Sequence, residues 1–260
     1  MARPGPPRTP QPTAPVRAFG AAPVDLELDF TSPDRPGVVT ALLAACAAPP
    51  AAEHWWQRTV GQRIAALLGV LQRAEAGEQL KHTLHCTSAS CGQRFEIDLP
   101  YAALTSSAPA DGAPDAEPSI ELQRSGGQPL RLRLPTGEDL RQWRSAKPAD
   151  REQALQAMLA TLCSAGTPTL QDAQQAALAL AEADPLVAFT VWCSCPACGA
   201  QAEHEIDLEG LALQRLAARQ HALLRDVHQL ASRYGWTERE VLEVAPARRA
   251  HYIALIEDEA

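Results

Sequence analysis

The spacing of hydrophobic residues predicts a long helix in each half of the chain. In residues 53–76, apolar side chains recur every three or four positions and would share one face of a helix. Residues 208–234 have the same spacing. A glycine follows each stretch, at the position where a left-handed residue commonly ends a helix. The two apolar stripes consist of Trp56, Val60, Ile64, Leu67, Leu68 and Leu71, and of Leu213, Leu216, Leu223, Leu224, Val227, Leu230 and Tyr234.

Shorter helices are predicted between prolines and capping residues. Thr136 with Asp139 is typical of a helix N-terminus, and Thr237 with Glu240 forms a capping-box pattern. Pro246 is expected to begin a last helix, with Tyr252, Ile253 and Ile256 facing inward. Further helices are expected at residues 38–47, 151–163 and 170–183.

Alternation with a period of two predicts strands. Leucine and arginine alternate over residues 130–134, and this run pairs in sequence with 120–122 across a Gly-Gly. A hairpin is the simplest interpretation. Two more β-like pairs surround cysteine turns. Because alanine and leucine dominate the apolar residues and favour helices, we expect an α+β fold that is mostly α.

The two cysteine turns resemble copies of one another. Each has a β-like run, a turn closed by Cys-Gly, and a second β-like run that ends in Glu-Ile-Asp-Leu. The second copy contains Cys-Pro-Ala-Cys-Gly, the usual spacing of a zinc knuckle, whereas the first has four residues between its cysteines. Two knuckles would complete one site. We therefore expect a split zinc-ribbon-like unit with a structural Zn²⁺ held by Cys86, Cys91, Cys195 and Cys198.

Alternative ligands remain open at this stage. Cys193 is as far from Cys198 as Cys86 is from Cys91, so strict repeat logic favours Cys193, while knuckle chemistry favours Cys195, which we prefer. The nearby histidines His85 and His204 are possible substitute ligands. A different interpretation is that the cysteines are free and hold no metal.

Other reactive side chains are more simply explained by packing. Cys46 and Cys163 lie on apolar helical faces and are expected to be buried thiols. Two histidines seven residues apart on the long C-terminal helix suggest no metal site. These histidines are His221 and His228. Of the adjacent tryptophans Trp55 and Trp56, one is expected in the core and one at a contact.

Composition excludes several functional classes. The net charge of −8 argues against a broad basic surface for nucleic acid. The chain has no apolar signal region and no run of about 18 apolar residues, so we expect a cytoplasmic protein without a membrane span. In a reducing compartment, paired cysteines more often bind metal than form disulfides. Motifs for phosphate loops, serine nucleophiles and zinc proteases are missing. We expect neither an enzyme nor a small-molecule substrate.

The predicted organisation has three parts. Residues 1–24 are rich in proline and are expected to form a disordered tail. Residues 25–208 would form the helical and zinc-ribbon-like domain, with an insertion at about 100–188. Residues 209–260 would form a C-terminal helical subdomain.

Several segments, taken in order, resemble the T4-type baseplate proteins, or baseplate hub assembly chaperones, of contractile phage tails and related injection systems. Together they cover most of residues 53–257. They are Glu-His-Trp-Trp at 53–56, the knuckle at 86–91, Leu-Arg-Leu-Pro-Thr-Gly-Glu-Asp-Leu at 132–140, Glu-Ala-Asp-Pro-Leu at 182–186 leading into 195–198, and the runs 225–231 and 234–252.

The resemblance implies a non-enzymatic structural or assembly protein that binds baseplate hub, spike or wedge proteins, either transiently or within the particle. The alternative is a zinc-ribbon protein that binds nucleic acid or acts in transcription, which the basic terminal helices favour. Acidic residues interleave with those basic ones and would repel phosphate. The residues are Arg233, Arg239, Arg248 and Arg249, with Glu238, Glu240 and Glu243.

Overall fold

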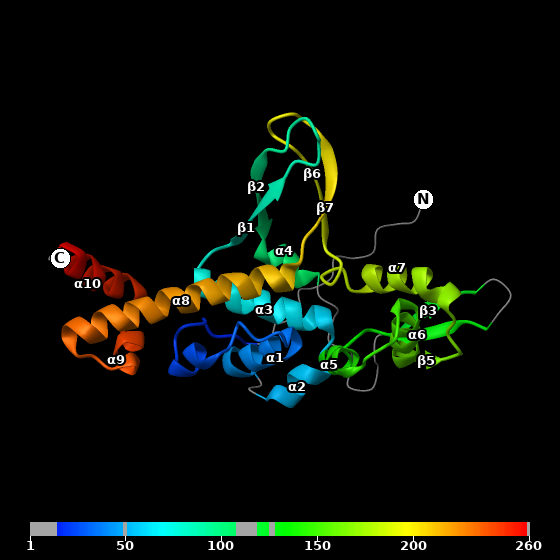
Figure 1. The fold of residues 1–260 in the computed structure, drawn as a ribbon, viewed down its shortest axis with the longest axis horizontal. Coiled ribbons are helices and arrows are strands. Elements are labelled where there is room, and N and C mark those ends of the chain that lie inside the picture. Colours follow the sequence, from blue (N-terminus) through cyan, green and yellow to red (C-terminus); the bar gives the residue numbers. More distant parts are fainter. Residues whose placement is uncertain (1–14, 49–50, 108–118, 125–127, 259–260) are drawn as a thin grey trace.

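The computed structural model describes residues 15–48, 51–107, 119–124 and 128–258. Most of these residues are helical, and their strands form three small antiparallel sheets. This confirms the mostly helical α+β class. A helical body occupies the centre of the molecule, an arm of strands projects from it, and the inserted region and the C-terminal helices extend from opposite ends (Figure 1).

Helix α3 (Val60–Glu75) lies at the centre of the body. It packs against α1 (Arg35–Cys46), α4 (Tyr101–Ser106) and the first half of α8 (Leu208–Tyr234). Its predicted stripe is buried: Leu67 and Leu68 are fully inaccessible. Each such side chain contributes roughly 1.5–3 kcal/mol relative to exposure, so this face is the main stabilising feature of the body.

The helix predicted at 53–76 is two helices, and the single-helix prediction was wrong. α2 (Ala52–Gln57) ends before Thr59, whose backbone is extended and whose side chain accepts a hydrogen bond from the Gln62 amide to begin α3. The Gln62 side chain in turn accepts from the Thr59 amide. A Thr-x-x-Gln capping box inside a continuous apolar stripe therefore outweighs the periodicity. At the other end, Ala76 rather than Gly77 takes the left-handed conformation, with φ 51°.

A buried arginine joins the first three helices. Arg63 is inaccessible to solvent and donates to the Thr40 hydroxyl (2.9 Å), the Trp55 carbonyl (2.7 Å) and the Pro36 carbonyl (2.8 Å). Desolvation lowers its pKa to about 10, so it stays charged at neutral pH. A Cβ at Gly137 would lie 2.2 Å from the Arg63 guanidinium, which explains the glycine.

As expected, one of the two adjacent tryptophans lies in the core and the other makes contacts nearer the surface. Trp55 is the core residue, with 2% of its surface exposed. Trp56, which the periodicity placed on the buried stripe, is only half-buried and carries the guanidinium groups of Arg63 and Arg141 near its ring, 5.2 and 4.9 Å from the centroid. Because α2 is separate from α3, its buried face is rotated relative to the predicted stripe.

The inserted region has a small core of its own. The predicted hairpin is confirmed by antiparallel pairing of β3 with β4, although its turn at residues 125–127 lies outside the described part of the chain. A third strand, β5, begins at Cys163, where the sequence predicted the end of a helix. α6 and α7 cover the sheet. The elements are β3 (Ser119–Leu122), β4 (Leu130–Arg133), β5 (Cys163–Ala165), α6 (Arg151–Leu162), η2 (Leu170–Asp172) and α7 (Ala173–Ala183).

The insertion is connected to the body through α5 (Gly137–Ser145). Thr136 and Asp139 form the predicted capping box at its start. The Val60 amide donates to the Pro135 carbonyl (2.9 Å), and the Gly137 amide donates to the Arg58 carbonyl (3.1 Å). The two helix N-termini therefore meet and fix the insertion against α3.

The boundary predicted at residue 209 lies inside helix α8. Leu208, Ala212 and Leu216 of α8 belong to the core of the body. A 27-residue helix extends about 40 Å, so α8 is longer than the body and its second half carries the last two helices. Gly235 ends α8 with φ 73°, as expected. The capping box at Thr237 is also confirmed, and the helices that follow are α9 (Glu238–Glu243) and α10 (Pro246–Asp258).

Part of the predicted N-terminal tail is ordered. Residues 1–14 lie outside the described residues, but Phe19 is fully buried and Val16 pairs with Ala47. The Asp25 carboxylate, at the end of this segment, accepts hydrogen bonds from Arg17 (2.7 Å) and from the Gly20 amide (2.7 Å). The short helix η1 (Pro23–Glu27) completes it. The prediction of a disordered tail rested on its many prolines and overlooked the apolar residues that pack on α1 and α8.

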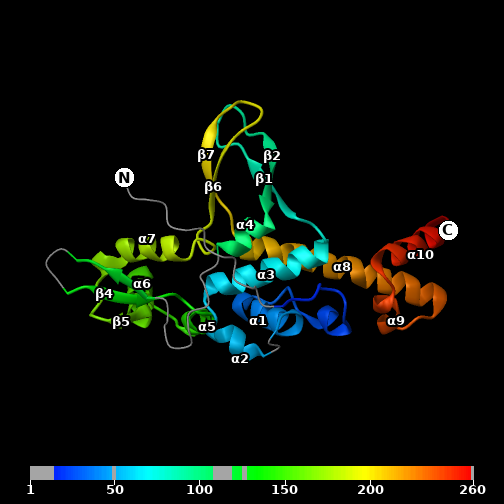
Figure 2. The same ribbon diagram turned by 180° about the vertical axis from the view of Figure 1, so that it is seen from behind.

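Two hairpins form the projection that we call the cysteine arm, residues 79–100 and 190–205. β1 (Gln79–His85) pairs with β2 (Arg94–Pro100), and β6 (Thr190–Ser194) pairs with β7 (Gln201–Glu205). The hairpins lie side by side and bring their turns together at the end furthest from the body (Figures 1 and 2).

Candidate metal centre

The two hairpins position their cysteines in the same way. The Cys86 amide donates to the Gln93 carbonyl and the Cys195 amide to the Ala200 carbonyl, each at 2.8 Å, directly after the last ladder pair. The first cysteine of each pair thus closes the ladder, and the second lies in the turn. Cys91 and Cys198 are the second cysteines, and each is followed by a glycine.

These glycines are required by backbone conformation. Gly92 has φ 58° and Gly199 has φ 74°, in the left-handed region that favours glycine. A Cβ at either position would have no atom within 4 Å. Glycine is therefore required by the backbone conformation of the turn that carries the thiol, and not by a lack of space for a side chain.

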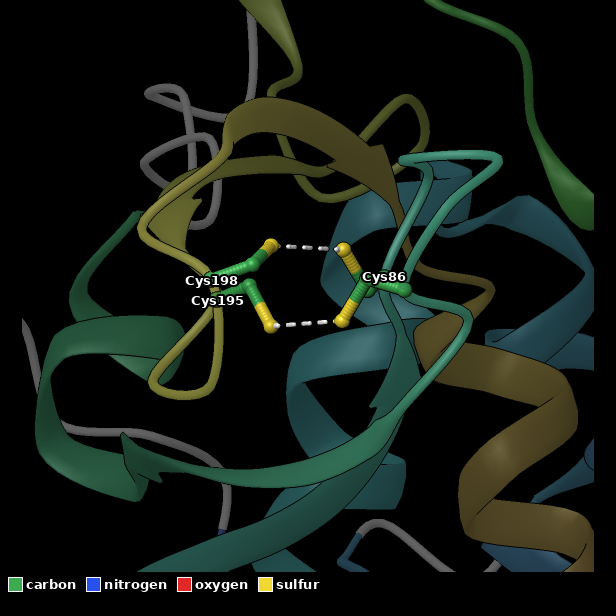
Figure 3. Close-up of side chains that lie close together, drawn as sticks. Cys86, Cys195 and Cys198 are labelled. Carbon is green, nitrogen blue, oxygen red and sulfur yellow. Dashed lines mark hydrogen bonds between the residues drawn. The ribbon is translucent and has the colours of Figure 1, made fainter.

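The structure brings together the four expected cysteines. Their sulfur atoms all lie within 4.8 Å of one another, with 3.6 Å between Cys86 and Cys198 and 3.9 Å between Cys91 and Cys195 (Figure 3). All four thiols are free. With metal–sulfur bonds of about 2.3 Å, the sulfurs of a tetrahedral zinc site are about 3.8 Å apart. The group can therefore hold a metal ion, and its donor set suits a tetrahedral thiolate site.

Charge in the cluster is distributed unequally. The backbone amides of Cys198 and Ala197 stabilise the Cys195 thiolate and lower its pKa to about 7. At Cys86, the amide of Ser88 favours the thiolate, but desolvation and the neighbouring thiols outweigh it and raise the pKa to about 12. Four adjacent thiolates repel one another, so a bound cation is needed for all of them to ionise together.

The ambiguity between Cys193 and Cys195 is resolved by the turn. Cys195 belongs to the group, while Cys193 lies within β6 opposite Ala202 and is half-buried. Counted from the shared Cys-Gly, the second turn is two residues shorter on its incoming side. Because side chains alternate between the two faces of a strand, a difference of two residues leaves corresponding side chains of the two copies on the same face. The two copies therefore remain recognisable as a repeat.

The other possible ligands lie outside the group. His85 is exposed on β1 opposite Arg94, and His204 packs edge-to-face against Phe95, with ring centroids 6.1 Å apart. His221 and His228 are exposed on α8. Among the remaining cysteines, Cys46 is buried as expected, with its thiol 3.7 Å from Asp25 Oδ1, whereas Cys163 is only half-buried.

Residues that sequence analysis missed fasten the arm to the body. Arg215 of α8 pairs with Glu75 of α3 at 2.7 Å and also donates to the Lys81 carbonyl of β1. The Tyr101 hydroxyl donates to the other Glu75 oxygen (2.9 Å), and desolvation together with this bond raises the pKa of Tyr101. These partners are far apart in sequence and follow no motif, so no local signal identified them.

A second fastening lies where β7 leads into α8. Asp207 caps α8 by accepting from the Gly210 amide (2.9 Å), and its carboxylate is held by Arg35 of α1. Arg35 lowers the pKa of Asp207 and also pairs with Glu209 at 2.6 Å. The cysteine arm is therefore joined to both α1 and α3.

Comparison with known proteins gave no match to a family model, to a curated protein or to a solved structure. Within the described residues, no helix is both long and apolar enough to cross a bilayer. Function must therefore be argued from the metal centre and from the sequence.

Proposed function

We propose that Cys86, Cys91, Cys195 and Cys198 hold a structural Zn²⁺ ion. The observation that carries this is the convergence of four sulfurs, contributed by two hairpins about a hundred residues apart, within 4.8 Å. Four thiolates select zinc or another thiophilic metal over magnesium or calcium. They also leave no open position for a reacting water, which favours a structural role. When bound, the ion cross-links the two hairpins.

The proposed role of the whole chain is that of a non-enzymatic structural or assembly protein of a contractile-tail baseplate, acting in the cytoplasm on hub, spike or wedge proteins. The ordered motifs over residues 53–257 support the family assignment. The four-thiol group, which would leave no open position on a bound ion, supports a structural role for the arm. Trp192, 69% exposed on the outer face of β6, is the kind of side chain that anchors protein interfaces.

The arm is a poor surface for nucleic acid, the competing function. Its strands carry Lys81 and Arg94 as basic residues. Four acidic side chains accompany them and would repel phosphate. They are Glu96, Asp98, Glu203 and Glu205.

Metal content is the first test. Purified protein should contain one zinc per chain by elemental analysis, and Cys195→Ser should lower this stoichiometry sharply because three thiolates bind more weakly than four. Cys193→Ser is the matched control and should keep the full content. Equal zinc loss in both variants, or a metal-free wild type, would contradict the proposal.

Partner recovery is the second test. The tagged chain, co-expressed with the genes of its tail cluster, should recover a hub, spike or wedge component. Trp192→Ala should weaken recovery at least tenfold, while Thr190→Ala, exposed on the same face, should not. Recovery of none of these components, together with salt-sensitive retention on DNA, would favour the nucleic-acid function instead.

A further inference from the structure

The second half of α8 and the last helix enclose a cleft far from the cysteine arm. α10 lies along α8 at the C-terminal end of the molecule (Figures 1 and 2). The cleft between them has a volume of about 300 Å³. Its walls are mainly apolar, with Ala222 and Leu223 on one side and Ile253 and Ala254 on the other.

A buried arginine with two unsatisfied donors faces this cleft. Arg249 is 3% exposed, and its Nε and Nη1 atoms have no hydrogen-bond partner among the described residues. A buried charge with unused donors is destabilising unless a partner satisfies it. Arg63 differs in degree: three oxygens accept from its guanidinium, and only its Nε lacks a partner among the described residues. Arg249 therefore has unused binding capacity.

The charged groups around the cleft define what would fit. Arg219 lines it from α8, held in place by a bond from its Nε to the Phe19 carbonyl (3.2 Å). Asp226 and Glu257 also line it; the Asp226 charge acts on Arg249 through space, but within the described residues neither carboxylate accepts a hydrogen bond from its Nε or Nη1. The two arginines and two carboxylates give the lining a formal charge of zero, so it offers no net attraction to a dianion such as phosphate, and binding depends on the unused Arg249 donors.

We propose that this cleft binds a monocarboxylate with a short aliphatic chain, anchored by Arg249. Nε and Nη1 lie on different edges of the guanidinium, so a carboxylate would accept from one of them together with Nη2, which completes a pair of parallel N–H donors on either edge. The aliphatic part of the ligand would contact the alanine, leucine and isoleucine walls. A free short-chain acid and the side chain of a partner's Glu or Asp share this chemistry. The proposal does not depend on the metal centre or on the baseplate role.

Butyrate is a suitable probe. Titration of the full-length protein with sodium butyrate, at constant ionic strength, should shift the Arg249 Nε–Hε signal in NMR spectra saturably, with a dissociation constant of roughly millimolar order for so small a ligand. Butyramide, neutral and of the same shape, should cause no shift. No saturable shift with butyrate, or an equal shift with butyramide, would overturn the proposal.

Variants identify the binding group. Arg249→Gln should abolish the butyrate response of the surrounding amides, whereas Arg248→Gln, the exposed neighbour on α10, should retain it. If Arg249→Gln does not fold, Ala222→Leu provides an independent test, because it fills the cleft and leaves the guanidinium intact. An unchanged response in Ala222→Leu would overturn the assignment.

Two further measurements separate the possible ligands. Asp226→Asn should tighten butyrate binding severalfold because it removes a repelling charge; weaker binding would mean that Arg249 merely pairs with Asp226 and would overturn the proposal. Methylphosphonate should bind more weakly than butyrate, and tighter binding would refute the carboxylate assignment. A glutamate-containing peptide that binds at least tenfold more tightly than butyrate would identify a partner side chain as the source, and equal affinity would identify a free acid.

Discussion

In the helical body, α3 buries a continuous face in which Leu67, Leu68 and Val70 are fully inaccessible. In the cysteine arm, β6 and β7 alternate between half-buried and exposed residues, and neither contains a fully buried side chain. The strands of the arm are also only two to a sheet, which is marginal for independent stability. At the base of the arm, Leu80 of β1 and Leu99 of β2 join the core of the body. The comparison teaches that apolar burial can stabilise the body and the base of the arm, whereas the end of the arm depends on its four thiols.

Removal of the metal should produce the largest difference in stability between the arm and the body. Chelation of zinc is expected to cost the arm on the order of 10 kcal/mol, the scale of structural zinc sites, because little apolar burial replaces it. Hydrogen exchange should show loss of protection in residues 83–85 and 190–205, with protection of α3 and of β1 around Leu80 retained. Re-addition of Zn²⁺, but not Mg²⁺, should restore it. Simultaneous loss of protection in α3 would mean that arm and body form one cooperative unit.

A cavity in the body should destabilise the body and leave the metal centre of the arm unchanged. Leu67→Ala is expected to lower the free energy of unfolding by about 2–5 kcal/mol, because the fully buried site cannot refill. Urea denaturation followed by tryptophan fluorescence measures this, and zinc content should stay unchanged. Leu178→Ala, on an α7 leucine that is 67% exposed, is the control and should change little. Zinc loss in Leu67→Ala would contradict the division.

The pH dependence of the body should reveal a buried carboxyl group. Asp184 is 1% exposed and accepts from the Gly61 amide at the start of α3 (2.9 Å), and desolvation raises its pKa to about 6. The folded protein then binds a proton more tightly than the unfolded chain, whose aspartate has a pKa of about 3.9. Stability should therefore fall as pH rises from about 4 to about 6 and then level off, by about 3 kcal/mol at most.

Asp184→Asn should remove this slope while its side-chain oxygen still accepts from the amide. Asp150→Asn is a matched control, because Asp150 also accepts from a backbone amide at a helix start but is exposed. Urea denaturation at a series of pH values would measure both variants. A slope that persists in Asp184→Asn would assign the pH dependence to another group.

The smallest effect concerns the break between α2 and α3. Thr59→Ala should lower the free energy of unfolding of the body by about 1 kcal/mol, because the Gln62 amide loses its acceptor. Thr59→Ser should retain most of the stability. Thermal unfolding of both variants, with zinc bound, measures the difference. No loss in Thr59→Ala would mean that the backbone hydrogen bonds of Val60 with Pro135 and of Gly137 with Arg58 fix the break by themselves.

Sequence predicted the local features because their causes are local. The end of α8 at Gly235 and the capping boxes at Thr136 and Thr237 each depend on residues within a few positions. The cysteine pairs were recognisable for the same reason, since one tight turn supplies two thiols. The predicted stripe of α8 was right at Leu216, Leu223 and Leu230, which are buried, but wrong at Leu224 and Tyr234, which are exposed. Another failure arose where two local signals competed, at Thr59, where a capping box interrupts an apolar stripe.

What the chain determined by itself is therefore a set of elements and two half-sites. Only the tertiary structure decided that the half-sites meet, because their proximity depends on α3 and α8 packing together and on Arg215 and Arg35 holding the base of the arm. The same holds for Arg249: nothing in its sequence neighbourhood indicates burial, and its unused donors result from α10 folding back against α8. Long-range packing has no local signature, since its partners are brought together only by the completed fold.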